Sequence, residues 1–260
     1  MRTTVNTYAS VLHACQTMIR KEDYMGAKRK ASRNDKYTNV VDISAPKKTE
    51  VKIIPRSIHQ EQYVLKLLDP QTSITFGIGP AGTGKTMLAV QAGVKKFKDG
   101  VVDRIIVTRP ACSVDEDLGF LPGTLEQKMA PWTRPIFDVL REYFNAFEIE
   151  SMIQEGVIEI APLAYMRGRT FKNAFIIADE MQNTTVGQMK MLLTRIGEGS
   201  EMAITGDLAQ ADYGKNNGLV DFMRLIEERK LSYIDIVQFE RGDVERHAVV
   251  KEVLAIYGEE

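Results

Sequence analysis

From Ile53 onward, short runs of apolar residues alternate with longer segments in which apolar residues recur every three or four positions. The short runs predict β-strands and the periodic segments predict amphipathic helices. The expected strands cover residues 73–78, 104–108, 157–161, 174–178, 201–205 and 232–238. The expected helices cover residues 85–97, 133–147, 185–196, 215–229 and 243–256. This alternation predicts an α/β fold, a mostly parallel sheet with helices on both faces, which binds ligands at the carboxyl ends of its strands.

The first 52 residues do not share this pattern. Residues 5–20 have a rough apolar face and predict a short helix. Between Arg20 and Arg56, 11 lysines and arginines stand against 5 acids, although the whole chain has a net charge of −1. Few large apolar residues lie in this stretch, so we expect residues 1–52 to form a helix and a basic arm or linker, with the folded domain over 53–260. The arm is either a solvated tail or a contact for nucleic acid.

Composition limits the class of protein. No apolar run approaches the length of a membrane span, and no signal-peptide pattern begins the chain. The two cysteines, Cys15 and Cys112, are too few for a disulfide framework. We therefore expect no membrane partner and a cytoplasmic location.

A phosphate-binding loop follows the first expected strand. Its residues are Gly79, Pro80, Ala81, Gly82, Thr83, Gly84, Lys85 and Thr86, a complete G-x-x-x-x-G-K-T motif that opens into a helix. Glycines allow the backbone to wrap around a polyphosphate, and the helix start directs amides at its negative charge. Lys85 is expected to contact the phosphates and the Thr86 hydroxyl to bind Mg²⁺. The motif predicts a nucleoside triphosphate, ATP, with Mg²⁺.

Two later strands end in polar residues that suit the same chemistry. The strand at 174–178 runs into Asp179 and Glu180, a Walker B arrangement in which Asp179 is expected to hold Mg²⁺ and Glu180 to activate water. The strand at 201–205 leads to Asp207 and Gln210, which are suited to sensing a γ-phosphate. The pair Asp-Glu-Met-Gln and Gly-Asp-Leu-Ala-Gln is more specific than either part.

These runs resemble motifs II and III of superfamily 1 helicases, and longer stretches resemble the PhoH family. The resemblance rests on residues 79–86, 108–111, 118–123, 159–171, 179–185, 188–195 and 205–207 and covers roughly residues 53–258. It implies a RecA-like P-loop ATPase core associated with RNA helicase activity. It also implies that Gln60, or alternatively Gln62, reads the adenine. One departure is Glu245, where the family has valine before the aligned Arg246.

Several arginines are candidates for nucleic acid. Arg167 and Arg169 flank a glycine after an expected strand and are suited to an RNA or single-stranded DNA backbone. The alternative is a structural pairing with acids such as Glu159. Arg109 follows another strand, where helicase-like cores contact the nucleic acid. Phe120 and Trp132 could stack on bases or pack into the core.

The length of the chain allows only one RecA-like domain, whereas a superfamily 1 helicase places ATP between two. An arginine finger would then come from a neighbouring subunit, and we expect a homo-oligomeric ring, a hexamer. The candidate fingers are Arg246, Arg195 and Arg241.

Three functions fit these features. The favoured one is an ATPase that remodels or unwinds RNA or single-stranded DNA. The second is a P-loop phosphotransferase acting on a small molecule, which Glu180 disfavours because it suits water activation. The third is an ATPase coupled to ribonuclease activity, for which the sequence outside the core offers no acidic metal cluster.

Overall fold

The computed structural model describes residues 50–110, 125–210, 217–227 and 229–245, together with Val249, Val253 and Ile256. For residues 125–132 it describes the course of the backbone only. The expected helices over 5–20 and most of 243–256, the basic arm, Phe120, the side chain of Trp132, and Arg246 lie outside the described residues.

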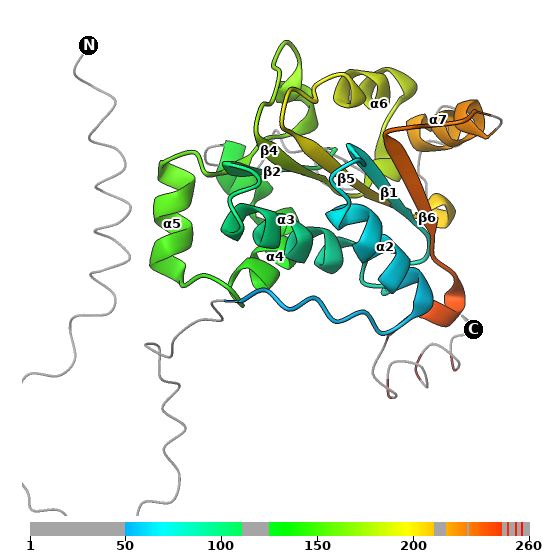
Figure 1. Ribbon diagram of the computed structural model, residues 1–260, viewed down its shortest axis with the longest axis horizontal. Coiled ribbons are helices and arrows are strands. Elements are labelled where there is room, and N and C mark those ends of the chain that lie inside the picture. Colours follow the sequence, from blue (N-terminus) through cyan, green and yellow to red (C-terminus); the bar gives the residue numbers. More distant parts are fainter. Residues whose placement is uncertain are drawn as a thin grey trace, which may run out of the picture. The chain divides into compact units, whose positions relative to one another are not determined.

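A six-stranded sheet forms the centre of the described domain (Figure 1). All of its neighbouring strands pair in parallel, in the order β3-β2-β4-β5-β1-β6. The strands are β1 (Ile74–Ile78), β2 (Arg104–Thr108), β3 (Ile158–Ile160), β4 (Ala174–Ala178), β5 (Glu201–Gly206) and β6 (Ile234–Gln238). The α/β fold expected from the alternating pattern is confirmed.

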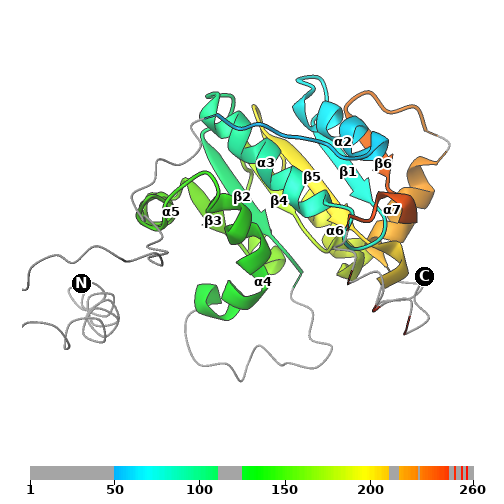
Figure 2. The ribbon, with the colours of Figure 1, turned by 90° about the horizontal axis from the view of Figure 1, so that it is seen from below.

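Two layers of helices cover the sheet, one on each face. Successive residues of a strand face opposite sides, so they belong to different cores. Ile105 and Ile177 belong to a core shared with α2 (Ile58–Leu68), α3 (Lys85–Lys98), α4 (Leu125–Leu140) and α5 (Ala146–Gln154). Ile106 and Ile176 belong to a second core, shared with α6 (Val186–Leu193) and α7 (Gly218–Ile226). Figure 2 shows α2, α3 and α4 lying across the first face. Both faces are buried, which explains the continuous apolar strands.

The expected helix over 133–147 is wrong in its bounds. The structure has two helices there: α4 ends at Leu140, and α5 begins at Ala146. Asn145 starts the second helix, because its side chain and that of Glu148 form a reciprocal capping box. Similarly, α7 begins at Gly218, since the Asn217 side chain accepts from the amides of Leu219 and Val220.

None of the helices in the described part of the chain is both long and apolar enough to cross a membrane.

Candidate functional site: a phosphate loop at the strand ends

The phosphate loop connects β1 to α3 in a shape that requires glycine. Gly79 has φ +148°, and a Cβ there would lie 2.4 Å from the backbone oxygen of Phe239. Gly84 adopts a left-handed conformation, φ 81°, as the N-cap of α3, where no side chain caps the helix. The first amides of α3 therefore have no capping partner from a side chain, which is the condition for binding an anion at a helix start.

Lys85 is buried at the loop, although it is a lysine. Its Nζ donates to the carbonyls of Gly79 (2.7 Å) and Pro80 (2.6 Å) and to Thr83 Oγ1 (3.2 Å). Burial lowers the pKa of Lys85, and the nearby carboxylates of Asp207, Glu180 and Asp179 oppose that shift. The ammonium is thus held inside the loop, among the groups that would surround a phosphate.

Asp179 joins the loop to two strands. Its Oδ1 accepts from Thr86 Oγ1 at 2.7 Å and from Thr205 Oγ1 at 2.5 Å. The residue is only 4% exposed. Strand β5 lies between β1 and β4, so the Walker B aspartate reaches the loop across the end of β5. The two residues predicted to bind Mg²⁺, Thr86 and Asp179, are therefore in direct contact.

Glu180 is the more accessible of the two carboxylates, with 35% of its side chain exposed. Its backbone is left-handed, φ 57°, which directs it differently from Asp179. Gln182 Nε2 donates to Glu180 Oε2, while Gln182 Oε1 accepts from the amide of Asp207 at 3.1 Å. Arg109 lies close to both carboxylates, 4.0 Å from Asp179 Oδ2 and 3.7 Å from Glu180 Oε1. Gln182 thus bridges the two strand ends, a role that the motif alone did not reveal.

Asp207 lies against the phosphate loop from the end of β5. Its Oδ2 accepts from the amide of Ala81 at 3.2 Å and its Oδ1 from that of Ala209 at 3.0 Å. One cavity of about 290 Å³ is lined by the loop, by the two carboxylates that follow β4, and by Asp207 and Gln210. Pro135 and Val139 of α4 add an apolar wall to it. The sequence-predicted phosphate, metal and sensor residues are thus brought together.

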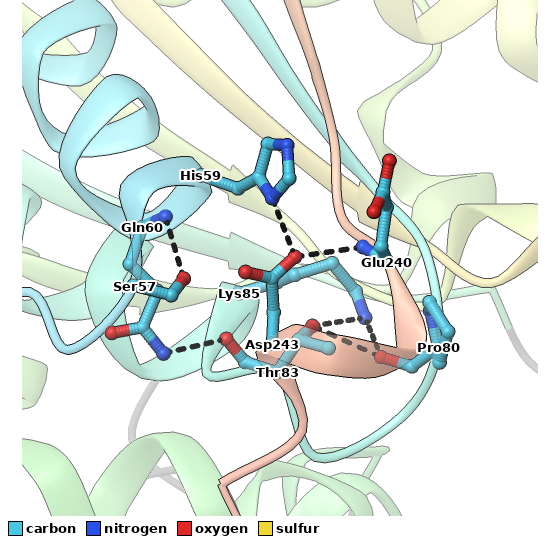
Figure 3. A network of polar contacts seen from close by, with 8 residues as sticks. All are labelled: Ser57, His59, Gln60, Pro80, Thr83, Lys85, Glu240 and Asp243. Carbon is cyan, nitrogen blue, oxygen red and sulfur yellow. Dashed lines mark hydrogen bonds and ion pairs between the residues drawn. The ribbon is translucent and has the colours of Figure 1, made fainter.

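Gln60 reaches the loop from α2 and is 2% exposed. Its Nε2 donates to the carbonyl of Thr83 at 3.0 Å (Figure 3). Its Oε1 accepts from the amide of Arg56 at 2.8 Å. Gln62, the alternative in the sequence, is exposed and forms no hydrogen bond recorded among the described residues. Of the two glutamines, Gln60 is the one at the loop.

The segment after β6 closes the other side of the loop. The amide of Glu245 donates to the carbonyl of Gly82 at 3.1 Å. Asp243 Oδ2 lies 2.8 Å from His59 Nδ1 and accepts from the amide of Glu240 at 2.7 Å (Figure 3). Burial alone would raise the pKa of Asp243, but hydrogen bonds from Ser57, Glu240 and His59 outweigh it and lower that pKa. This connection could not be predicted from the sequence, because His59 and Asp243 are 184 positions apart.

The predicted arginines differ in what they contact. Arg169 forms a bidentate ion pair with Glu159 and lies over the ring of Phe171, the structural alternative that the sequence allowed. Arg195 donates to the carbonyls of Met191 and Arg169 and to Thr194 Oγ1. Arg167 and Arg241 are exposed. Arg246 lies outside the described residues.

Comparison with known proteins identifies the family of this chain. The family model described as PhoH-like protein matches residues 52–258. A PhoH-like protein of Bacillus subtilis (strain 168) is 45% identical over 204 residues, which is 78% of this chain and 63% of the relative. Protein PhoH of Escherichia coli (strain K12) is 43% identical over 209 residues, 79% of this chain and 58% of the relative. The chain thus spans about three fifths of the length of the curated relatives it matches.

Among solved structures, the match to the DUF1998 helicase MrfA bound to DNA covers 78% of this chain and 30% of the helicase chain. The sequence identity is 11% and the TM-score is 0.42. That likeness is too distant to bear on function. The extent of the family match and the identity to its curated members are sufficient by themselves to establish the family. The chain belongs to the PhoH-like family, and its phosphate loop lies in a P-loop NTPase fold.

Proposed function

We propose that this chain binds ATP with Mg²⁺, hydrolyses it with Glu180 acting on the water, and couples hydrolysis to RNA or single-stranded DNA. The observation that carries the proposal is the convergence of three strand ends on one cavity. The phosphate loop follows β1, Asp179 and Glu180 follow β4, and Asp207 follows β5. Positioning a phosphate, a metal ion and a water in one place is most of what phosphoryl transfer requires.

The residues present fit Mg²⁺ and a polyphosphate. Thr86 Oγ1 and Asp179 Oδ1 are hard oxygen donors 2.7 Å apart, and Mg²⁺ prefers a few such protein oxygens together with phosphates and waters. The start of α3 has no side-chain cap and carries the positive end of the helix dipole. Bound Mg²⁺ would neutralise charge on the phosphate oxygens. Lys85 would exchange its loop carbonyls for phosphate oxygens.

Hydrolysis is favoured over transfer to a small acceptor because of the surroundings of Glu180. A general base must be accessible, oriented and an acceptor. Glu180 lines the cavity and is partly exposed, and Gln182 and Arg109 hold its carboxylate from two sides. Gln182 also contacts the amide of Asp207, so a change at the phosphate sensor would reach the base directly.

The nucleic-acid and assembly parts of the proposal rest on fewer contacts. Arg109 follows β2 and lies beside both carboxylates, so a nucleic-acid strand bound at Arg109 would act on the hydrolytic site. The proposal places a cation from a neighbouring copy at the γ-phosphate of this core, in a closed ring such as a hexamer. The unwinding of RNA and the cytoplasmic location expected from the cysteine content belong to the same proposal.

The experiment is to measure ATP turnover by the purified chain alone, with RNA and DNA homopolymers, and with small hydroxyl acceptors, alongside native mass measurement. We expect release of inorganic phosphate that increases with one of the homopolymers. Phosphate appearing on a small acceptor in place of free phosphate would favour the phosphotransferase. Turnover that no homopolymer changes would remove the nucleic-acid part.

A further inference from the structure

Tyr165 is an exposed aromatic side chain on a well-anchored turn. It lies in the 3₁₀ helix η2 (Leu163–Met166), which begins after a two-residue connection from β3, and is 63% exposed. Its neighbours Leu163 and Met166 are buried in the core beside α6. The amide of Tyr165 donates to the carbonyl of Pro162 at 2.8 Å, and that of Arg169 to the carbonyl of Met166 at 3.2 Å. The ring therefore projects from a turn whose position the core fixes.

The two arginines after this turn have separate roles. Arg169 is held by Glu159, whose hydrogen bond raises the pKa of the guanidinium, and it lies 4.5 Å from the centre of the Phe171 ring. Arg167 is exposed, and no hydrogen bond or ion pair engages it among the residues that the structure describes. An exposed cation two residues from an exposed ring matches what a single strand requires, a charge for its backbone and a face for its bases.

The turn also adjoins the hydrolytic site. The amide of Leu163 donates to the carbonyl of Arg109 at 3.4 Å, across the ends of β3 and β2. The side chain of Arg109 in turn lies beside Asp179 and Glu180. A nucleic-acid strand bound at η2 would therefore act on Arg109, the residue that lies beside both carboxylates.

We propose that Tyr165 is a stacking platform for a base of single-stranded nucleic acid, with Arg167 contacting the adjacent phosphate. This inference rests on the proposed function, since it assigns the contact through which a strand would meet the ATPase. Stacking is tolerant of sequence because every base has a π-face, so the site would not select among bases.

The test measures binding of fluorescently labelled (U)12 and (dT)12 to the full chain by anisotropy. Tyr165→Ala should weaken binding about 5- to 150-fold, the range expected from losing one base stack, whereas Tyr165→Phe should stay within about twofold. Arg167→Ala should lower the slope of log affinity against log salt by about one. Comparing the loss of affinity for (U)12 with the loss of affinity for (dT)12 identifies which nucleic acid is bound at Tyr165.

Two controls make the result specific. Tyr233 is 68% exposed just before β6, at the opposite end of the strands, so Tyr233→Ala should bind as the wild type does. An oligonucleotide with abasic sites in place of its bases keeps its phosphates, so Tyr165→Ala should bind it as well as the wild type does.

The proposal is overturned if Tyr165→Ala binds (U)12 and (dT)12 as tightly as the wild type. It is equally overturned if the loss is the same on the abasic strand, or if only the oligomeric mass changes, which would make Tyr165 a subunit contact. A wild-type chain that binds neither strand contradicts the proposed function itself, so the two failures are distinguishable.

Discussion

Asp243 connects the segment after β6 to the start of α2, which is distant in the sequence. Its carboxylate meets His59 on α2, the amide of Glu240 after β6 and, through Ser57, the start of α2. The same segment donates a hydrogen bond from Glu245 to the loop residue Gly82. The arrangement stabilises the loop from the β6 side, away from β5, and it is the residue-scale feature with the clearest consequence for stability.

We expect Asp243→Asn to lower the free energy of unfolding by about 1–3 kcal/mol, because hydrogen bonds to a buried charge are lost or weakened. Asp138→Asn is the matched control, since the pair of Asp138 with Arg141 is exposed, and it should change stability by less than about 1 kcal/mol. Chemical denaturation at neutral pH measures both. Equal effects of the two substitutions would contradict this role.

The pH dependence of stability follows from the direction of the Asp243 shift. Its pKa is lower in the folded protein than in the unfolded chain, so its contribution is fully present above the unfolded pKa of about 3.9 and is lost as the pH falls through the folded pKa. The stability difference between wild type and Asp243→Asn should therefore be constant near neutrality and shrink below about pH 4. A difference that grows on acidification would reverse the assigned sign.

At the scale of elements, the strands were predictable, because a strand buried on both faces is a short apolar run between turns. The phosphate loop and the Walker B pair were also predictable, because each is a motif that is local in sequence. The break between α4 and α5 was not predicted, because the apolar spacing continues across Leu140 and Ala146 while Asn145 caps a new helix. Contacts such as that of His59 with Asp243 depend on the tertiary fold.

Close packing of α3 on β4 gives a prediction at this scale. A Cβ on Gly93 of α3 would lie 2.7 Å from the ring of the buried Phe175, whereas a Cβ on Gly187 of α6 would meet nothing within 4 Å. Gly93→Ala should lower the free energy of unfolding by about 1–3 kcal/mol through overpacking. Gly187→Ala should raise it by about 0.5–1 kcal/mol, because alanine favours helix. Unfolding curves that shift in the same direction would contradict the packing argument.

At the scale of the whole molecule, the described residues hold one phosphate-loop domain, and three arginines were candidates to complete it in trans. Arg195 already donates three hydrogen bonds within its own subunit, which disfavours it as the finger. An arginine finger is worth on the order of 10³–10⁵ in rate where one operates. In the proposed ring, assembly would therefore bear directly on activity.

Mixing two inactive variants tests the ring. Arg246→Ala keeps an intact phosphate loop, and Lys85→Ala keeps an intact finger, so a mixed oligomer should recover ATP turnover that neither variant has alone. A mixture of Arg195→Ala with Lys85→Ala should give no more turnover than Arg195→Ala itself contributes. The absence of recovery with Arg246→Ala and with Arg241→Ala, together with an active monomer, would contradict the trans arrangement.

The central claim is that Glu180 acts on water at a site that binds ATP independently of it. The most direct measurement is a single-turnover comparison of the wild type with Glu180→Gln, which follows ATP binding and phosphate release in the same samples. We expect Glu180→Gln to bind ATP within a few-fold of the wild type and to release phosphate about 10²–10⁴-fold more slowly, the usual contribution of a general base. Phosphate release by Glu180→Gln at near the wild-type rate would contradict it.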